Sequence, residues 1–321
     1  MGFLMLTDSR RRDLQAVMTG EYSCVVGEDG GGEWSLEQLA EEASPVEVDA
    51  WVYLDGTEFA GIAQKVAADT EAGTVTWSGA SWAGVLAAQV LRADPGQANL
   101  RVRGEANAVL LQLVGRMGLS EEFGVSAEDS GLSVDWEFPR FADGWTGIRS
   151  MLRACGGRPA ASWSPSERRV VLSAVPAGPS DASGTTLPMR VVRDHRPWNH
   201  IVAAGEGEGT QRVEAEWFAD AKGNVSKTQT FFGAARRTYF YDYGSSSDIE
   251  EDSKKKLEEL QAADEVEIYV GGEEELSPGS MCRCDAPIAG IAPVCEIDRK
   301  EISLTLGEEP EYGYEAKRSA V

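Results

Sequence analysis

Short segments in which apolar and polar residues alternate recur along this sequence, and they predict a fold made mainly of β-strands. In residues 213–217, Val, Ala and Trp alternate with two glutamates, and in residues 73–79 Val75 and Trp77 fall on one face of the predicted strand. A period of two residues places successive side chains on opposite faces, so each such strand buries one face and leaves the other in water. Trp51–Leu54 is an uninterrupted apolar run followed by Asp55-Gly56, which predicts a buried strand ended by a turn.

Three apolar stripes at helical spacing interrupt these strands, and each follows a residue that can cap a helix. Ser81 precedes the first stripe, Asn107 precedes a second that Gly118 ends, and Asp143 precedes a third that ends before Gly156-Gly157. Side-chain oxygens of Ser, Asn and Asp accept hydrogen bonds from the first amides of a helix, and glycine adopts the left-handed conformation that ends one. The sequence therefore predicts three short helices in its first half.

The order of these elements predicts three domains. Residues 1–100 are expected to form a first β-barrel-like domain, 101–188 a small α+β domain, and 189–321 a second β-barrel-like domain. A stretch rich in Pro, Gly and Ser, residues 176–188, marks the second boundary. The fold class is thus expected to be α+β, mainly β, with two barrel-like domains bracketing a small α+β domain.

The last predicted domain combines strands with one charged helix. A capping box at Ser247 to Glu250 predicts an exposed helix at about 247–263. The polar tail from Gly307 is expected to fray. Further strands are expected at 225–232, 266–270, 281–284 and 294–306.

The charge of the chain excludes several classes of partner. The sequence has 30 Lys and Arg against 53 Asp and Glu, a net charge of -23. Binding to nucleic-acid phosphates or to anionic membranes depends on Lys and Arg, so neither is expected. No stretch approaches the ~20 apolar residues of a membrane helix, and residues 1–8 lack the basic start of a signal peptide. We expect synthesis in the cytoplasm, without a signal peptide or membrane insertion.

No set of residues in the sequence predicts catalysis or a bound cofactor. The two histidines, His195 and His200, lie in one short segment, so no distant triad histidine exists. Cys282, Cys284 and Cys295 could form a three-thiol cluster on neighbouring strands, but a zinc site needs a fourth ligand. Small buried side chains are the favoured interpretation of these cysteines, and whether they do anything beyond packing stays open. We expect no enzyme activity, no metal and no cofactor.

One aromatic segment stands out as a candidate interface. Tyr239, Phe240, Tyr241 and Tyr243 put aromatic rings on both faces of one apparent strand. A strand in a two-layer domain buries one face, so the second aromatic face is expected to meet a partner or a neighbouring domain. Phe231 and Phe232 precede this strand and complete the set of interface candidates.

Several motifs together resemble a known family. In the first domain they are Leu54 to Phe59, Gly73 to Gly79 and the helix at Trp82. In the last domain they are Asn199-His200-Ile201, Gly223-Asn224, Gln229 to Gly233, Tyr241-Asp242-Tyr243, the charged helix ending at Gln261, and the final strands. In this order the chain resembles tail proteins of long-tailed phages and prophages of Gram-positive bacteria, and it is similar in plan to the baseplate hubs of contractile tails.

The resemblance implies a structural role at the tail tip or baseplate of a virion. Proteins of this kind are hubs in which two related β-barrel domains per chain form a ring, so self-association, as a homotrimer, is expected. The expected partners are the distal tail protein, the tail tube, the tape-measure protein and downstream tip or receptor-binding proteins. Because the chain ends at Val321, wall digestion is expected to belong to other chains. Alternatives are a carbohydrate- or receptor-binding tail module and, with less support, a cell-wall hydrolase built on carboxylates such as Asp135 and Glu137.

Overall fold

The chain folds into two compact units. The first contains Met1–Arg190 and Glu267–Val321, and the second contains Val191–Val266. Strands β14 (Met189–Arg193) and β19 (Asp264–Ile268) lie where the chain passes from one unit into the other. The computed structural model describes residues 3–27, 30–177, 189–193, 198–206, 212–242, 248–261, 264–268, 276–283 and 294–318.

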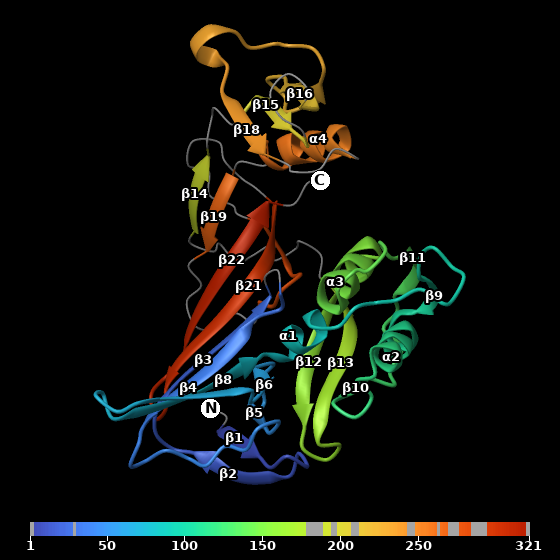
Figure 1. The fold of residues 1–321 in the computed structure, drawn as a ribbon. Helices are drawn as coiled ribbons and strands as arrows, with labels where there is room; N and C mark the ends of the chain where they lie inside the picture. The colour runs from blue at the N-terminus through green and yellow to red at the C-terminus, as the bar shows by residue number, and fades with distance from the viewer. Residues whose placement is uncertain are drawn as a thin grey trace. The chain divides into compact units, whose positions relative to one another are not determined.

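A large sheet forms one side of the first unit (Figure 1). Within this unit its strands are, in spatial order, β22 (Glu311–Arg318), β21 (Val294–Thr305), β3 (Glu21–Gly27), β4 (Glu33–Leu39), β8 (Thr74–Ala80) and β7 (Lys65–Asp69), with β20 (Met281–Arg283) beside β21. β21 and β3 are antiparallel, with Ile302 opposite Cys24 and Leu304 opposite Tyr22. All four side chains are buried, so strands from the start and the end of the sequence share one hydrophobic face.

Smaller sheets and three helices complete the first unit. One sheet has the order β2 (Asp13–Val17), β1 (Leu4–Thr7), β5 (Trp51–Leu54) and β6 (Ala60–Ile62). The middle of the chain adds the pair β11 (Ser133–Glu137) and β9 (Arg101–Glu105), and the sheet β10 (Phe123–Val125), β13 (Arg169–Pro176) and β12 (Gly157–Ser164). The helices are α1 (Trp82–Ala87), α2 (Ala106–Met117) and α3 (Gly144–Ala154).

Aromatic contacts join the first segment to the middle segment in a single core. The Trp163 ring stacks on Tyr53 with centroids 4.9 Å apart and lies 5.6 Å from Trp51. Trp82 of α1 meets Trp145 of α3 edge to face at 5.3 Å. Large buried aromatic rings supply much of the apolar area that a core removes from water. Residues 3–177 therefore fold around one continuous core together with β21 and β22.

Buried ion pairs connect the last hairpin, β21–β22, to this core. Lys300 of β21 lies 2.6 Å from the Glu58 carboxylate, and the two side chains are only 8% and 12% exposed. Arg149 of α3 lies 3.0 Å from Asp298 of β21, with side chains 17% and 13% exposed. Charges removed from water need such partners, because an unpaired buried charge is strongly unfavourable.

The second unit is a four-stranded sheet covered on one face by a helix. The order of its strands is β17 (Val225–Ser226), β16 (Glu214–Ala219), β15 (His200–Ala204) and β18 (Thr238–Asp242), and a 3-10 turn, Gly233–Ala235, precedes β18. Helix α4 (Ile249–Glu259) packs on β15 and β16 through Ile249 and Leu257. Its charged residues are exposed or half-buried, and the Lys254 ammonium lies over the Trp217 ring of β16, 5.9 Å from its centroid.

Two of the three predicted helix caps in the first half are confirmed, and one is wrong. Ser81 and Asp143 accept hydrogen bonds from the amides of Gly84 and Thr146. Glu105, not Asn107, caps α2 by accepting from the amides of residues 107 and 108. Asn107 lies within the first turn of α2, and its buried side chain donates a hydrogen bond to the Glu128 carbonyl and accepts one from the Ala174 amide.

None of the helices in the described ranges is long and apolar enough to cross a membrane.

The mainly β, α+β class is confirmed, with differences in particular elements. No sheet closes into a barrel in the part of the chain that the structure describes, and the strand orders are those of open sheets. The tail does not fray as predicted, because β22 pairs with β21 and buries Tyr314 and Ala316. The strand predicted at 225–232 is only the two residues of β17. Within the linker predicted at 176–188, residues 178–188 lie outside the described residues.

Candidate functional site

The predicted aromatic interface lies on β18, at one edge of the sheet in the second unit (Figure 1). β18 runs parallel to β15, with Ile201 opposite Tyr239, Val202 opposite Phe240 and Ala203 opposite Tyr241. Ile201 and Ala203 face α4, so the alternation of the strand places Tyr239 and Tyr241 on that side and Phe240 on the other.

The structure separates the predicted interface residues into two groups. Tyr239 and Tyr241 are half-buried and pack on the core beneath α4, where Tyr239 also meets Trp198 edge to face at 5.8 Å. Phe240 is 59% exposed, and Phe232, beside the 3-10 turn, is 68% exposed. Phe231 is half-buried, and Tyr243 lies outside the described residues. The exposed aromatic surface of this unit is therefore carried by Phe240 and Phe232.

On the sheet face opposite α4, the His200 side chain of β15 forms hydrogen bonds to both neighbouring strands, β18 and β16. Its Nδ1 lies 2.7 Å from the Thr238 hydroxyl on β18, and its Nε2 lies 2.8 Å from the Glu216 carboxylate on β16. The ring stacks on Phe218 with centroids 4.6 Å apart and is only 3% exposed. Both nitrogens are thus engaged within the sheet, which gives the histidine a structural role. His195 lies outside the described residues.

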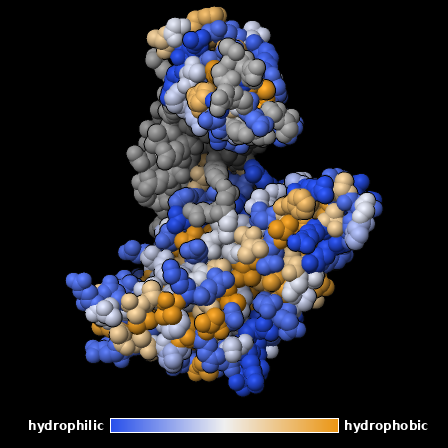
Figure 2. Space-filling view, viewed as in Figure 1, coloured by the Kyte–Doolittle hydropathy of each residue, from blue (hydrophilic) through white to orange (hydrophobic). Residues whose placement is uncertain are grey.

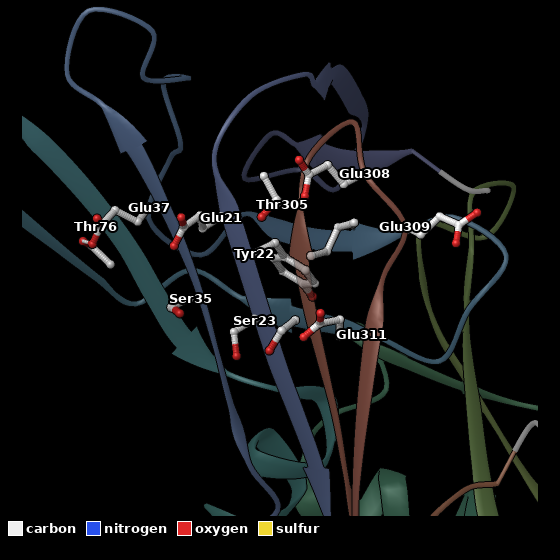
Figure 3. Close-up of a pocket in the computed structure, with 12 residues that line it drawn as sticks. Glu21, Tyr22, Ser23, Ser35, Glu37, Thr76, Thr305, Glu308, Glu309 and Glu311 are labelled. Carbon is white, nitrogen blue, oxygen red and sulfur yellow. Dashed lines mark hydrogen bonds between the residues drawn. The ribbon is translucent and has the colours of Figure 1, made fainter. Parts of the chain in front are cut away.

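A glutamate-lined depression occupies the outer face of the large sheet in the first unit (Figure 3). It has a volume of about 340 Å³. Its carboxylates are Glu21, Glu37, Glu308, Glu309 and Glu311, and its hydroxyl groups belong to Ser23, Ser35, Thr76, Ser303 and Thr305. Neither lysine nor arginine is among the residues that line it. The depression is therefore a negatively charged surface that repels phosphates.

Strand register explains why small polar residues gather in this depression. Ser303 of β21 lies opposite Ser23 of β3, which lies opposite Ser35 of β4, and Ser35 lies opposite Ser78 of β8. Opposed residues point to the same face of a sheet, so these serines form one row across four strands. This surface was not predicted from the sequence, although the alternation of Glu and Ser with buried residues on β3 and β4 was a usable signal.

The cysteines of the described residues have the environment of packing groups. Cys24, Cys155 and Cys295 form no disulfide, and Cys24 and Cys295 are buried. Burial raises the pKa of the Cys24 thiol to about 12, so this thiol stays protonated at neutral pH and is a poor nucleophile. Cys282 lies opposite Cys295 in the β20–β21 register, and Cys284 lies outside the described residues. Across the described ranges no group of three or more His, Cys, Asp or Glu side chains has a metal-binding arrangement.

Comparisons with known proteins bear on the fold. No protein-family model matches the chain, and no curated protein matches it in sequence. Among solved structures, the tail protein from Neisseria meningitidis MC58 aligns with 99% of this chain and 97% of its own, at 13% identity and a TM-score of 0.51. The 43 kDa tail protein of prophage MuSo2 from Shewanella oneidensis aligns over the same shares, 99% and 97%, at 11% identity and a TM-score of 0.54.

At such identities the likeness concerns the fold. The Gram-positive origin that the sequence motifs suggested stays a prediction, as does assignment to the hub family. Over nearly its whole length, this chain has the fold of phage and prophage tail proteins.

Proposed function

We propose that this protein is a structural hub or baseplate subunit of a phage-type tail. In this role it self-associates as a trimer and connects the tail tube and distal tail ring to the proteins of the tip. The observation that carries the proposal is the full-length likeness to two tail proteins, because it includes both units and leaves almost no part of the chain unaligned.

The exposed aromatic residues of the second unit support self-association. Phe240 and Phe232 are more than half exposed, and aromatic side chains are enriched in the centres of protein–protein contacts. The three-part division at residues 100 and 188 stays a prediction, in which residues 1–100 and 189–321 are the outer parts that meet other copies. Strand β21 of the last part pairs with β3 of the first part, so these two parts share one sheet.

The proposed role is structural and not enzymatic. His200 is engaged on both ring nitrogens, and the buried Cys24 thiol is held protonated. Such a subunit acts by burying surface area against its neighbours, on the order of 2,000 Å² or more in permanent assemblies. Partners and location follow from the same proposal: other tail proteins at the tip of a virion.

The acidic surface suits a conduit through which DNA passes without adhering. The net charge of -23 and the glutamate-lined depression both repel a polyanion. The protein is therefore expected to show no DNA binding, even at low salt, in a fluorescence-anisotropy assay. Measurable binding of DNA by the unmodified protein would remove this part of the proposal.

Mass measurement on the purified protein tests the central claim. Sedimentation equilibrium is expected to give a species of three times the chain mass of 34.6 kDa. Antibody labelling of induced particles is expected to mark the distal end of the tail. A single subunit at every concentration, together with absence from particles, would end the proposal. Binding of cell-wall glycan by that lone subunit would point instead to the carbohydrate-binding alternative.

A further inference from the structure

Each of the two units has a sheet that ends in an open edge strand. In the second unit the strand order ends at β18, and in the first unit the order of the large sheet ends at β7. Over the ranges the structure describes, neither strand pairs with another on its outer side. An open edge presents backbone amide and carbonyl groups that can pair with a further strand.

Neither edge carries a bulge or a proline, two of the features that block strand addition to natural edge strands. Both edges are short and carry charged end residues, Lys65 and Asp69 on β7 and Asp242 on β18, so only a strand with complementary charges is expected to pair with them. β18 and β7 are each five residues long, contain no proline and pair with their inner neighbours without a register shift. Every residue of β7 is exposed, including Val66 at 51%, and Phe240 of β18 is 59% exposed. Figure 2 shows apolar residues among hydrophilic ones over the β7–β8 hairpin.

We propose that β18 of one copy pairs antiparallel with β7 of a second copy, with Phe240 opposite Ala67. This inference rests on the proposed self-association and names the surfaces that carry it. The antiparallel direction places Asp242, whose carboxylate also pairs with Arg212 of its own chain, opposite Lys65, which makes a favourable cross-strand pair of opposite charges. The parallel direction would place Asp242 opposite Asp69, which is unfavourable.

The register follows from the two hydrophobic faces. Val66 lies opposite Trp77, which lies opposite Leu36, so Val66 belongs to the core-facing side of the large sheet. Tyr241 belongs to the core-facing side of its own sheet. With Phe240 opposite Ala67, Tyr241 comes opposite Val66, and both core-facing sides lie on one side of the joined sheet. A slip of one residue would place them on opposite sides.

Size and charge fit this pairing as well. The large Phe240 ring lies over the small Ala67 side chain, which leaves it room. Lys65 forms no ion pair with any described residue, and the proposed pairing supplies it with a carboxylate, that of Asp242. The two paired surfaces differ, so each copy can pair through β18 with one neighbour and through β7 with another. Such a head-to-tail contact between unlike surfaces forms closed rings when the rotation between copies closes.

Disulfide trapping tests the pairing directly. Opposed residues on antiparallel strands have Cα atoms about 4.5–5.5 Å apart, within the range of a disulfide. Chains carrying Ala67→Cys are mixed with chains carrying Phe240→Cys and oxidised. We expect a species of twice the chain mass on a non-reducing gel of the mixture. Each variant alone should show only the background of the five native cysteines.

Three other results would overturn the pairing. β7 could instead pair with β7 of a second copy, since Lys65 would then lie opposite Asp69 at both ends. That symmetric contact would trap Ala67→Cys chains by themselves. The absence of any trapped species in the mixture, while the unmodified protein sediments as a trimer, would also refute the pairing and leave the proposed function standing. A wild-type protein that remains a single subunit would refute both.

A charge placed on the edge gives a second measurement. Ala67→Lys puts a long cation opposite Phe240 and is expected to raise the dissociation constant of the assembly at least roughly tenfold. The matched control is Ala127→Lys, the same change at an exposed loop position of the first unit. Both variants should keep the wild-type circular dichroism spectrum. Equal dissociation constants for the two variants would contradict the pairing.

Discussion

At the scale of single residues, a buried charge pair is the most informative feature of the first unit. Glu58 accepts hydrogen bonds from Lys300 and Ser277, at 2.6 Å and 2.9 Å. The Lys300 ammonium also lies 5.3 Å from the centroid of the Phe59 ring. Burial lowers the pKa of nearby Arg158, and the Glu58 charge opposes this shift. One carboxylate therefore balances two partly buried cations.

Glu58→Gln should consequently destabilise the protein strongly. The change leaves buried Lys300 without its ion-pair partner and removes a negative charge near Arg158, and we expect a loss of about 3–5 kcal/mol in the free energy of unfolding. The matched control is Asp94→Asn, which breaks an exposed pair with Arg116 and should cost no more than about 1 kcal/mol. Urea denaturation measures both. Similar losses for the two variants would show that the Glu58 pair is not the fastening proposed for β21.

At the scale of elements, the start of helix α2 depends on one carboxylate. Burial raises the pKa of Glu105, but hydrogen bonds from the Ser130 hydroxyl and from the amides of Asn107, Ala108 and Ser130 outweigh it and lower the pKa to about 2. A carboxyl whose pKa is lowered by folding stabilises the folded state above its ordinary pKa of 4.5. That stability is lost as the pH falls from about 4.5 toward 2.

Glu105→Gln should therefore lower the melting temperature at pH 7 and lose its effect in acid. We expect a cost of about 1 kcal/mol at pH 7, as for other helix caps. The difference in melting temperature between variant and wild type should shrink as the pH falls through this window. Glu128→Gln, an exposed neighbouring carboxylate, serves as the control. A difference that stays constant from pH 7 to pH 2.5 would contradict the role of the ionised cap.

The approach of the β3–β4 turn to α1 requires a glycine at one position. A Cβ atom on Gly31 would lie 2.2 Å from the backbone of Ala83, whereas a Cβ on Gly30 would meet nothing within 4 Å. Both residues have positive φ, at 81° and 103°, so alanine is strained at either. We expect Gly31→Ala to lower the free energy of unfolding by about 1–3 kcal/mol more than Gly30→Ala. Equal losses in urea denaturation would mean that only backbone strain matters here.

Elements whose boundaries are set by contacts between residues close in sequence could be predicted from the sequence, and elements set by contacts between distant segments could not. The caps at Ser81 and Asp143 and the stop at Gly118 were correct because a capping bond joins residues close in sequence. β22 had a usable signal in the alternation of Tyr312, Tyr314 and Ala316 with polar residues, which was missed. The pairing of β21 with β3 could not be predicted, because packing between distant segments sets it.

The same limit applies to the candidate interface. The aromatic content of β18 was visible in the sequence, but which rings are exposed depends on the side that α4 covers. α4 covers the side of Tyr239 and Tyr241 and leaves Phe240 outward. The open edges of β18 and β7 are likewise a property of the sheet order, which no local pattern encodes.

At the scale of the whole molecule, the net charge governs how copies of the chain approach one another. At -23, two copies repel over distances comparable to the Debye length, which is about 30 Å at 0.01 M salt and about 8 Å at 0.15 M. The single pair of Lys65 and Asp242 at the proposed contact is too small to offset this repulsion. Self-association of this protein should therefore strengthen as salt is added.

Sedimentation velocity between 0.02 M and 0.5 M sodium chloride tests this expectation. We expect the dissociation constant of the trimer to fall by roughly tenfold or more over this range. A variant with Gln in place of Glu308, Glu309 and Glu311 carries three fewer negative charges and should assemble at lower salt than the wild type. Assembly that weakens with added salt would mean that attraction between charges holds the copies together. In that case the aromatic and edge-strand surfaces of β18 and β7 would not be the main source of affinity.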